Sequence, residues 1–558
     1  MKAWPLILTA LLSTAAHAVV DMKTANYSDT WVDLIAPGSG YDLRVQRTYN
    51  SRTIYNGMFG FGWCSDFETR LEVTPESNLK VVECGAGSEV VYVPKKFDNK
   101  KVEQTVASIM DEVKKRNKGM SDKSLKELGS DLKDDDYFRE EFAKRIGLKG
   151  SVNKDTTYHA SGRENETILR QESSYKRNLS DGTFQLFDLN GRLTAMFDRN
   201  SNSLKLIYGK NRLTGVVDNN GRRLNFTYDA NTKRVKKVTG PNNLVANYVT
   251  KGEDLREVTN AWKKKYKYEY DDLHNMTKSI LPEGTHKTIT YNQDKDWVTG
   301  FVNEKGCSEN YEYKVNPDDP KNHYWSTVVK KCGDKVTNRS SFEFFHRPRA
   351  DLTGIYLYRV KSDVNGQLTD IVYHEIFGKP VTSIRGNYKT EYTYFDSGLV
   401  KTKKEPARFT AFEYKNSCNK VSKVDVDYYD VSGKEKSDKP KVLRKIATTF
   451  TYDTKKCNLS FAENSDGQTV KLQYDARGRI AVIEDQSKKL VKIKYEEKYG
   501  KPEIVTRPGL GTIKVAYKAD GEISSVDSKE GPQVAVQVAS IFNNLLDIIA
   551  PAQAETIL

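Results

Sequence analysis

The sequence predicts an all-β, repetitive fold in which antiparallel hairpins form a long curved sheet, as a partial or closed β-shell. Three observations lead to this prediction. A tyrosine recurs about every 21 residues, the residues before it alternate between apolar and polar, and a polar or glycine-containing turn follows it. The apolar fraction is only 37% and the mean hydropathy is -0.68, which suits thin sheets that are wet on one face.

The first 18 residues predict a secretory signal peptide, residues 1–18. They contain a positively charged start, the apolar segment WPLILTALL and the small-residue cleavage signal Ala16-His17-Ala18. We therefore expect an exported protein whose mature chain begins at Val19 and which is periplasmic, extracellular or on the cell surface. No later segment approaches the roughly 18 apolar residues that a membrane span needs, so we expect no membrane span.

Residues 19–186 predict a β-rich N-terminal module that is interrupted by a helical insertion over residues 99–148. Apolar residues recur at helical spacing in KKVEQTVASIMDEVKKRN, Ser121 is placed to cap a second helix, and an acidic run at 134–136 precedes a third. The acidic run lacks the spacing of a calcium-binding EF-hand loop, so helix capping is the favoured interpretation. We expect the insertion to cover a sheet edge or one end of the shell, or to dock a partner.

Residues 187–527 hold the repeat. In KYKYEYDD, tyrosines alternate with charged residues, which is typical of a strand with one buried face. Glycine turns such as Gly478-Arg479-Ile480 provide the positive φ of a tight reversal. Each repeat is therefore predicted to be two strands joined by a turn, and neighbouring repeats must stack because one hairpin cannot bury its face alone.

One tyrosine in each repeat serves as its marker. Neighbouring markers lie 20 to 22 residues apart within three runs, and the segments NPDDPKNHYW and DVSGKEKSDKPK lengthen the two remaining steps. Packing between repeats is favoured over stacking on sugars or bases, because the residue has a fixed place in every repeat. The predicted repeat-packing residues are Tyr208, Tyr228, Tyr248, Tyr270, Tyr291, Tyr313, Tyr373, Tyr394, Tyr414, Tyr452, Tyr474, Tyr495 and Tyr517.

Six cysteines in an exported chain predict disulfide bonds. The sequence alone permits 15 pairings. Pairing between sequence neighbours is favoured, because each such bond closes a short loop between candidate neighbouring strands and stabilises the fold by about 3 kcal/mol in the chain-entropy model. The predicted bonds are Cys64–Cys84, Cys307–Cys332 and Cys418–Cys457.

Residues 528–558 predict a C-terminal amphipathic helix. One stripe is apolar, and the opposite face carries glutamine, serine, asparagine and aspartate without basic residues, so the helix is poorly suited to a membrane surface. We expect it to pack against the concave face of the sheet, and binding to an external groove is the alternative. The apolar stripe consists of Val534, Val538, Ile541, Phe542, Leu545, Ile548 and Ile549.

No catalytic constellation is recognisable, so we expect a protein that is not an enzyme. The sequence predicts no catalytic residues, no cofactor-binding residues, no cofactor and no metal site, and no cysteine lies at a zinc-ligand spacing. The formal net charge of +14 is spread over the polar strand positions. It can keep an edge-rich sheet soluble or attract anionic envelope polymers, and because no nucleic-acid module is present we expect no specific nucleic-acid binding.

Two motifs, together with the repeat period, resemble the Rhs family. The Tyr-Asp…Gly-Arg-Ile/Leu skeleton at this spacing resembles the YD repeat over roughly residues 180–527. The segment RVQRTYNSRTIYNGMFGFGWCSDFETRL resembles the N-terminal module that precedes the repeats in bacterial Rhs proteins, and DGTFQLFDLNGRL resembles the junction of that module with the first repeat. The residues that match the N-terminal module are Arg47, Tyr49, Asn50, Ser51, Gly57, Gly60, Gly62 and Trp63.

The resemblance implies that the repeats form a long β-sheet that spirals into a hollow shell. Large bacterial members of the family enclose a toxic C-terminal domain, and their animal relatives, the teneurins, use the barrel in cell-surface adhesion. This chain is shorter in repeats, and we expect no separate C-terminal toxin domain.

The function expected from these features is a structural or interaction role, in which the shell binds or shelters a protein or an envelope polysaccharide. One alternative is a component of a toxin-delivery system that acts on a separately encoded cargo. A second alternative is a carbohydrate-binding surface protein.

Overall fold

The computed structural model is mostly antiparallel β-structure, and its described residues include three helices near the N-terminus, which confirms the all-β repetitive fold. The predicted signal peptide and most of the predicted C-terminal helix lie outside the residues that the structure describes. The structure describes residues 19–548 except 39, 86, 95–99, 161–162, 351–353, 431–440, 498–499, 519–521, 529, 531–533, 535, 537, 539 and 541–547.

One long sheet accounts for most of the molecule, and each strand from β7 to β42 pairs antiparallel with the next. The alternating sequence explains this, because in β21 Tyr268 is buried while Lys267 and Glu269 are exposed. The first strands of this sheet are β7 (Arg70–Val73), β8 (Leu79–Val82), β9 (Glu89–Pro94), β10 (Thr157–Ala160), β11 (Arg163–Arg170), β12 (Ser174–Asn178), β13 (Phe184–Asp188), β14 (Leu193–Phe197), β15 (Ser203–Gly209), β16 (Arg212–Asp218), β17 (Arg223–Tyr228), β18 (Val235–Thr239), β19 (Val245–Lys251), β20 (Asp254–Thr259), β21 (Lys265–Tyr270), β22 (Met276–Ile280), β23 (His286–Tyr291), β24 (Val298–Val302) and β25 (Ser308–Val315).

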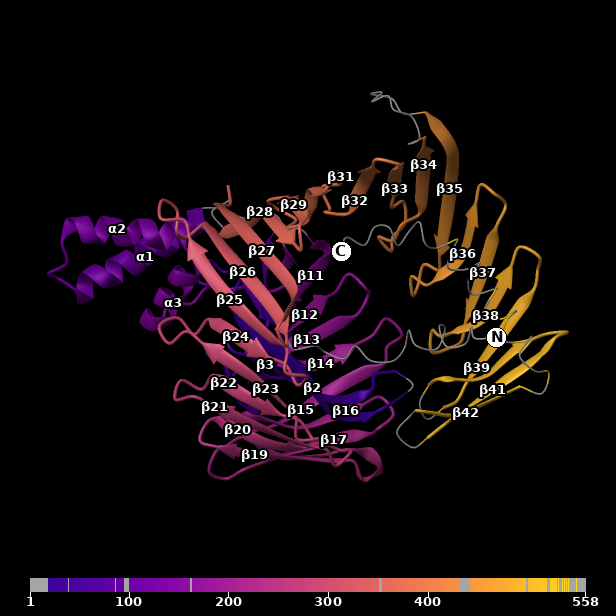
Figure 1. Ribbon diagram of the computed structural model, residues 1–558, viewed down its shortest axis with the longest axis horizontal. Coiled ribbons are helices and arrows are strands. Elements are labelled where there is room, and N and C mark those ends of the chain that lie inside the picture. The colour runs from indigo at the N-terminus through magenta and orange to yellow at the C-terminus, as the bar shows by residue number, and fades with distance from the viewer. Residues whose placement is uncertain are drawn as a thin grey trace.

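The same sheet continues through the second half of the chain. Its three longest consecutive strands, β26 to β28, connect the early repeats to the later ones, and β36–β42 lie opposite β13–β17 (Figure 1). These strands are β26 (His323–Cys332), β27 (Lys335–Pro348), β28 (Ile355–Val364), β29 (Gln367–Tyr373), β30 (Pro380–Arg385), β31 (Tyr388–Tyr394), β32 (Val400–Glu405), β33 (Arg408–Glu413), β34 (Lys423–Tyr429), β35 (Val442–Tyr452), β36 (Leu459–Asn464), β37 (Thr469–Tyr474), β38 (Ile480–Asp485), β39 (Leu490–Tyr495), β40 (Pro502–Arg507), β41 (Gly511–Tyr517) and β42 (Ile523–Ser528).

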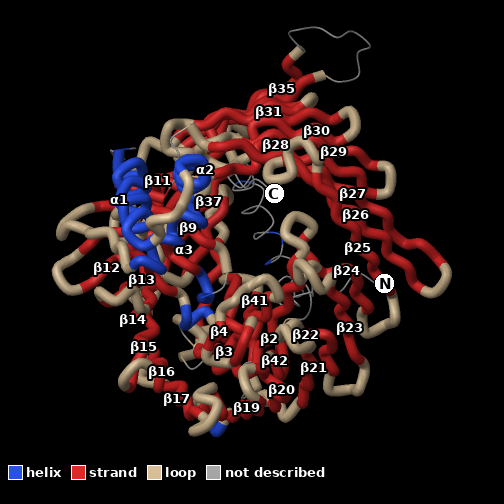
Figure 2. Tube along the Cα trace, turned by 90° about the vertical axis from the view of Figure 1, so that its left-hand side faces the viewer, coloured by secondary structure: helices blue, strands red, loops and turns tan. Residues whose placement is uncertain are grey.

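Two contacts bring distant parts of this sheet together, and the strand order is closed. Arg70 in β7 forms an antiparallel bridge with Arg192, next to β14. In the later repeats, Gly478 has a φ of +76° and lies so close to the β14–β15 turn that an added Cβ would be 2.0 Å from the side-chain oxygen of Asn200. The strands therefore follow one another around the molecule, as Figure 2 shows. The positive φ at the second contact favours glycine.

A smaller sheet lies inside the first part of the shell. Its buried faces form one core with the concave side of the early repeats, which includes Trp31, Tyr49 and Trp63 together with Tyr248 and Tyr268. A two-stranded sheet follows it along the chain. The four-stranded sheet consists of β1 (Val19–Asp21), β2 (Asn26–Ala36), β3 (Leu43–Asn50) and β6 (Trp63–Cys64), and the pair consists of β4 (Asn56–Gly57) and β5 (Gly60–Phe61).

A second, separate core lies on the concave side of the later repeats. It contains aliphatic and aromatic side chains of β32–β39, among them Phe412 and Phe450, and three residues of the predicted C-terminal helix: Val534, Val538 and Ile548. The exposed Val536 and Ser540 alternate with the buried residues. For these described residues, the tail packs against the concave sheet, as its apolar stripe predicts. The other stripe residues, Ile541, Phe542, Leu545 and Ile549, lie outside the described residues.

The helical insertion forms a small domain of its own on one side of the shell (Figure 1). The Ser121 and Asp135 side chains cap the second and third helices, and Gly147 ends the third in the left-handed conformation. A buried ion pair of 2.6 Å joins Arg139 to Glu76 between β7 and β8, which anchors the domain to the long sheet. Its helices are α1 (Lys100–Arg116), α2 (Asp122–Asp134) and α3 (Asp136–Ile146).

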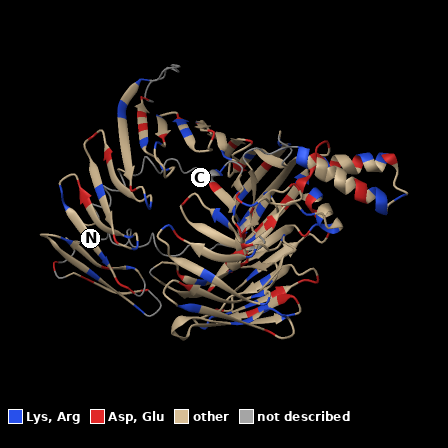
Figure 3. Ribbon diagram, turned by 180° about the vertical axis from the view of Figure 1, so that it is seen from behind, with Lys and Arg blue, Asp and Glu red and all other residues tan. Residues whose placement is uncertain are grey.

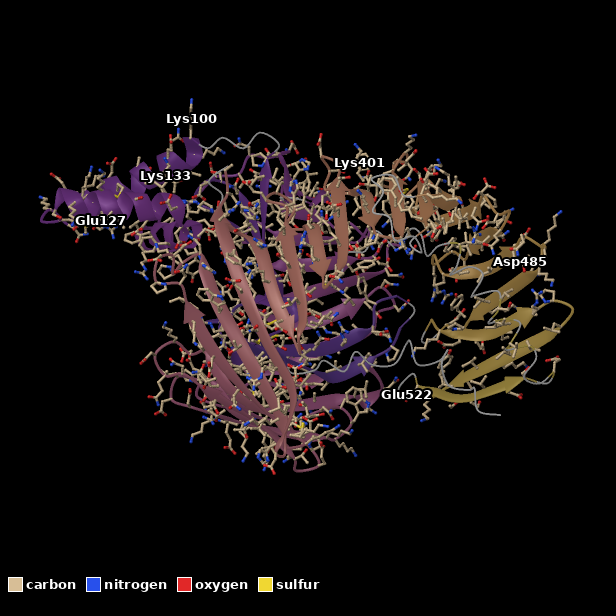
Figure 4. The ribbon with its side chains drawn as sticks, turned by 45° about the horizontal axis from the view of Figure 1, so that its top comes forward. Lys100, Glu127, Lys133, Lys401, Asp485 and Glu522 are labelled. Carbon is tan, nitrogen blue, oxygen red and sulfur yellow. A yellow bond between two sulfur atoms is a disulfide. The ribbon has the colours of Figure 1, made fainter. Side chains whose placement is uncertain are left out.

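Charged side chains of both signs are interspersed along the strands and helices (Figure 3). Lys100, Glu127 and Lys133 on the helices and Lys401 and Glu522 on the later repeats are exposed, and Figure 4 shows them at the outer surface. No helix within the described residues has the length and apolar character that a membrane span requires.

Candidate functional site

The marker tyrosines hold each repeat to the one before it. With one exception, each hydroxyl whose hydrogen bond is resolved donates to the backbone carbonyl that follows the preceding turn, as Tyr228 does to Leu213 at 2.7 Å and Tyr495 does to Ile480 at 2.7 Å. The exception, Tyr248, donates to the Asp33 carboxylate of the inner sheet at 3.1 Å. The other residues that show the common bond are Tyr208, Tyr270, Tyr291, Tyr313, Tyr394, Tyr414, Tyr452, Tyr474 and Tyr517.

This regular bond makes the tyrosine ladder a structural device. The rings are half-buried or buried, and burial raises the pKa of Tyr228 and Tyr495 above the ordinary tyrosine value. Tyr373 occupies the same place in its repeat and is half-buried. A hydroxyl that already donates within the wall is poorly placed to bind a ligand.

All six cysteines form disulfides in the pairs that the sequence favours. Cys307–Cys332 joins the two ends of the β25–β26 hairpin, and Cys418–Cys457 joins the turns of successive repeats. The expectation that each bond links neighbouring strands is wrong for Cys64–Cys84. This bond connects β6 of the inner sheet to the short 3-10 turn Glu83–Gly85 after β8, so it ties the inner sheet to the shell.

A buried arginine lies at the centre of the N-terminal module. Arg47 is fully buried, pairs with Asp33 at 2.7 Å and donates to the Tyr268 hydroxyl at 2.7 Å. Its guanidinium lies 4.4 Å from the ring centroid of Trp63 and 5.2 Å from that of Trp31. The motif that resembles the Rhs N-terminal module therefore forms the contact between inner sheet and shell, in which the guanidinium is held by an ion pair and by aromatic rings.

Among the described residues, part of the concave surface between the two cores is half exposed. Phe344 is buried, but Phe342, Val360, Ile371 and Tyr373 are only partly buried, and within the described residues none of the five belongs to either core. Strand pairing aligns Phe344 with Val360 and Val360 with Ile371, so the side chains point to the same side. We call these five residues the inner apolar face.

Aromatic and titratable side chains continue the inner apolar face toward the inner sheet. The Tyr324 ring stacks on Phe344 with centroids 5.1 Å apart and on His346 at 5.4 Å. Burial and the nearby charge of Lys23 lower the pKa of His346, which keeps this imidazole neutral at physiological pH. Burial, with a smaller contribution from Asp21, raises the pKa of Tyr324 to about 12. The Tyr324 and His346 side chains themselves are therefore uncharged at neutral pH.

Metal ligation and surface hollows can be described for the part of the chain that the structure describes. Within this part, no group of three or more His, Cys, Asp or Glu side chains is arranged to hold a metal ion. A hollow on the later repeats is lined by residues that include Phe409, Asp425 and Ser465, and its Lys445 ammonium pairs with Asp427 at 3.1 Å. The inner apolar face can bind apolar groups of another chain, but it presents no nucleophile with a base beside it.

Comparison with known proteins gives one family match and several structural likenesses. A family model described as a domain of unknown function, DUF6531, matches residues 18–92, which include the inner sheet. No curated protein matches the chain. One similar structure is "Crystal Structure of TcdB2-TccC3-TEV", with 11% identity, a TM-score of 0.35, and coverage of 90% of this chain and 26% of that chain.

A second similar structure is "Structure of Photorhabdus luminescens Tc holotoxin pore, Mutation TccC3-D651A". It is 8% identical, with a TM-score of 0.30, and the match covers 87% of this chain and 30% of that chain. The protein thus spans about a quarter to a third of the length of these chains.

Proposed function

We propose that this protein is an exported Rhs-type shell that binds or shelters a partner protein, and that it acts by binding rather than by catalysis. The observation that carries the proposal is the inner apolar face, which lies between two filled cores and is itself half exposed. The apolar side chains of such an interior surface remain partly exposed to water unless another polypeptide covers them. The partner occupies the middle of the shell.

The two ends of the interior show what kind of chain the concave wall accepts. At one end the wall packs against strands of the inner sheet, which contribute Trp31 and Tyr49. At the other end it packs against apolar residues of the C-terminal segment, such as Val534. Both occupants present a row of apolar side chains. A partner segment with one apolar face, in a strand or a helix, fits the inner apolar face in the same manner.

Photo-crosslinking at neighbouring positions tests the proposal. Ile371 points to the interior. Asp370 in the same strand lies opposite Lys361, forms an ion pair with Arg359 and points outward. A photo-reactive amino acid in place of Ile371 should crosslink the mature protein to one discrete protein in envelope fractions, and the same group in place of Asp370 should not. Equal crosslinking at the two positions, or none at either, contradicts the proposal.

The same experiment addresses the toxin-delivery alternative. A cargo that is encoded separately would appear as the species crosslinked at position 371, and its sequence would identify it. A shell that only braces the envelope would instead crosslink to a structural envelope protein. The identity of the crosslinked protein therefore decides between these two forms of the proposed function.

A further inference from the structure

The outer face of β26–β28 carries an unusual concentration of aromatic and cationic side chains. Trp325, Phe345 and Lys361 alternate along their strands with the inward-facing Ser326, Phe344 and Val360, so they point away from the interior. In most other repeats this outer face carries lysine, glutamate or threonine, as in KYKYEY of β21. We call the residues Trp325, Phe345, Arg347, Tyr358 and Lys361 the outer aromatic patch.

The cations of the outer aromatic patch are held against its rings. The Arg347 guanidinium lies 3.6 Å from the centroid of the Tyr358 ring, and the Lys361 ammonium lies 5.3 Å from that of Phe345. The Phe345 and Tyr358 rings are themselves 5.9 Å apart. Such contacts restrict the cationic side chains before any ligand arrives, which lowers the entropic cost of binding an anion.

The patch has an excess of positive charge and two acceptor carboxylates. Arg347 is exposed, and within the described part of the chain no carboxylate lies within ion-pair distance of it. Glu343 accepts from His323 at 2.8 Å and lies 3.6 Å from Lys361. Asp370 is paired with Arg359 at the border of the patch. A ligand therefore meets an unpaired guanidinium, partly exposed rings and carboxylate oxygens on one surface.

We infer that the outer aromatic patch binds an acidic polysaccharide. Partly exposed rings can stack on the apolar faces of sugar units, Arg347 can pair with a sugar carboxylate, and Glu343 can accept sugar hydroxyls. A nucleic acid such as DNA fits less well, because its sugars carry no free hydroxyl along the chain that Glu343 could accept. A protein interface fits less well too, because charged groups lie among the rings where such an interface has a dry apolar centre.

This inference does not depend on the proposed function, because the patch lies on the opposite side of the sheet from the inner apolar face. Titration of the mature protein with alginate, a polyuronate, tests it by affinity electrophoresis or calorimetry. Dextran serves as the neutral polysaccharide, and poly-glutamate and single-stranded DNA serve as anions of other classes. We expect saturable binding to alginate that is at least tenfold tighter than binding to the other three.

Two variants and two matched controls locate the binding site. Trp325→Ala should weaken alginate binding about tenfold and Arg347→Ala about fivefold, since each removes one stacking or ionic contact. Trp262→Ala and Arg212→Ala are the controls. Trp262 is 42% exposed on another turn, and the exposed Arg212 lies 5.4 Å from the ring centroid of Tyr228 on another hairpin. Both controls should leave binding within twofold.

Four outcomes would overturn the inference. Alginate that fails to bind excludes an acidic-polysaccharide site. An equal loss for Arg212→Ala and Arg347→Ala shows that the net charge of the chain is responsible, and an unchanged affinity for Trp325→Ala shows that the patch is not involved. DNA or poly-glutamate binding as tight as that of alginate assigns the patch to another class of ligand. Each variant should have the same melting temperature as the parent protein, which verifies that the comparison is between folded proteins.

Discussion

The early and the later repeats build the same wall but fill it differently. In both, the marker tyrosine donates to a carbonyl of the preceding repeat, as Tyr228 and Tyr495 illustrate. In the early repeats the concave side is covered by a separate sheet that brings two tryptophans and a buried ion pair. In the later repeats the concave side is covered by aliphatic side chains of the C-terminal segment.

The difference shows that the repeat determines the wall, and that non-repeated segments determine how firmly each part is packed. Tyr268 and Tyr270 use their hydroxyls to accept bonds from the inner sheet, from Arg47 and from Trp63. In the second core, the described tail residues Val534, Val538 and Ile548 meet the wall through apolar side chains. We therefore expect the early repeats to be the more stable part and the later repeats to be the part that opens first.

The largest expected effect comes from removing the centre of the first core. Trp63 is fully buried and its indole N–H donates to the Tyr270 hydroxyl at 2.8 Å. Trp63→Ala should lower the free energy of unfolding of the early repeats by about 3–5 kcal/mol. Hydrogen exchange measured by mass spectrometry should show faster exchange in peptides from β19–β24 and unchanged exchange in β36–β41. Equal acceleration in both parts would show that the shell unfolds as one unit.

Raising the pH should lower the free energy of unfolding of the early repeats by about 3 kcal/mol or less, and should leave that of the later repeats nearly unchanged. Burial raises the pKa of Glu68 from 4.5 to about 7, although its carboxylate accepts bonds from the Ser65 and Met58 amides. A carboxyl whose pKa is higher in the folded chain favours the fold below pH 4.5, and this contribution is lost as the pH rises through 7. The upper limit follows from about 1.4 kcal/mol per pKa unit.

Hydrogen exchange at pH 5 and pH 8, corrected for intrinsic exchange rates, measures this difference. The early repeats should lose stability between the two values, whereas β36–β41 should change little. Glu68→Gln removes the titrating group and should flatten the dependence in the early repeats. A dependence of the same size in the variant would assign it to another group.

Local features of the fold could be predicted from the sequence because they depend on neighbours along the chain. The tyrosine period, the caps at Ser121 and Asp135 and the disulfide pairs all follow from spacing within a few tens of residues. The long sheet already begins with β7–β12, before residue 187, where the repeat begins in sequence. The tyrosines of those strands, such as Tyr158 in β10 and Tyr175 in β12, do not follow the period, so the period does not reveal the strands.

Features that join distant segments could not be predicted in this way. Neither core includes the inner apolar face among the described residues, and no local pattern encodes the extent of either core. Cys64–Cys84 likewise joins two sheets. The outer aromatic patch did carry a local signal, since HYWSTVVKKC has aromatic residues at consecutive positions, which places rings on both faces of one strand.

A smaller effect is expected for the contact between the tail and the later repeats. Val538 is 8% exposed in the second core, and Val536 is 63% exposed. Val538→Ala should destabilise the attachment of the tail by about 1.5 kcal/mol, from the buried methyl groups that it removes, and Val536→Ala should have almost no effect. Limited proteolysis should release the tail faster in Val538→Ala alone. Equal cleavage rates in both variants would mean that the buried stripe does not hold the tail.

The smallest expected effect tests whether the wall is the same in both parts. Tyr228→Phe and Tyr495→Phe each remove one hydroxyl that donates to a carbonyl at 2.7 Å, without removing the ring. Each substitution should lower the local free energy of unfolding by about 1 kcal/mol, the net value of a typical hydrogen bond. Hydrogen exchange in the hairpin that contains the substitution measures this change. Similar costs in both would mean that the two parts differ in their filling alone. A cost confined to Tyr228→Phe would mean that the hydroxyl bond stabilises the wall only where a firm core lies behind it.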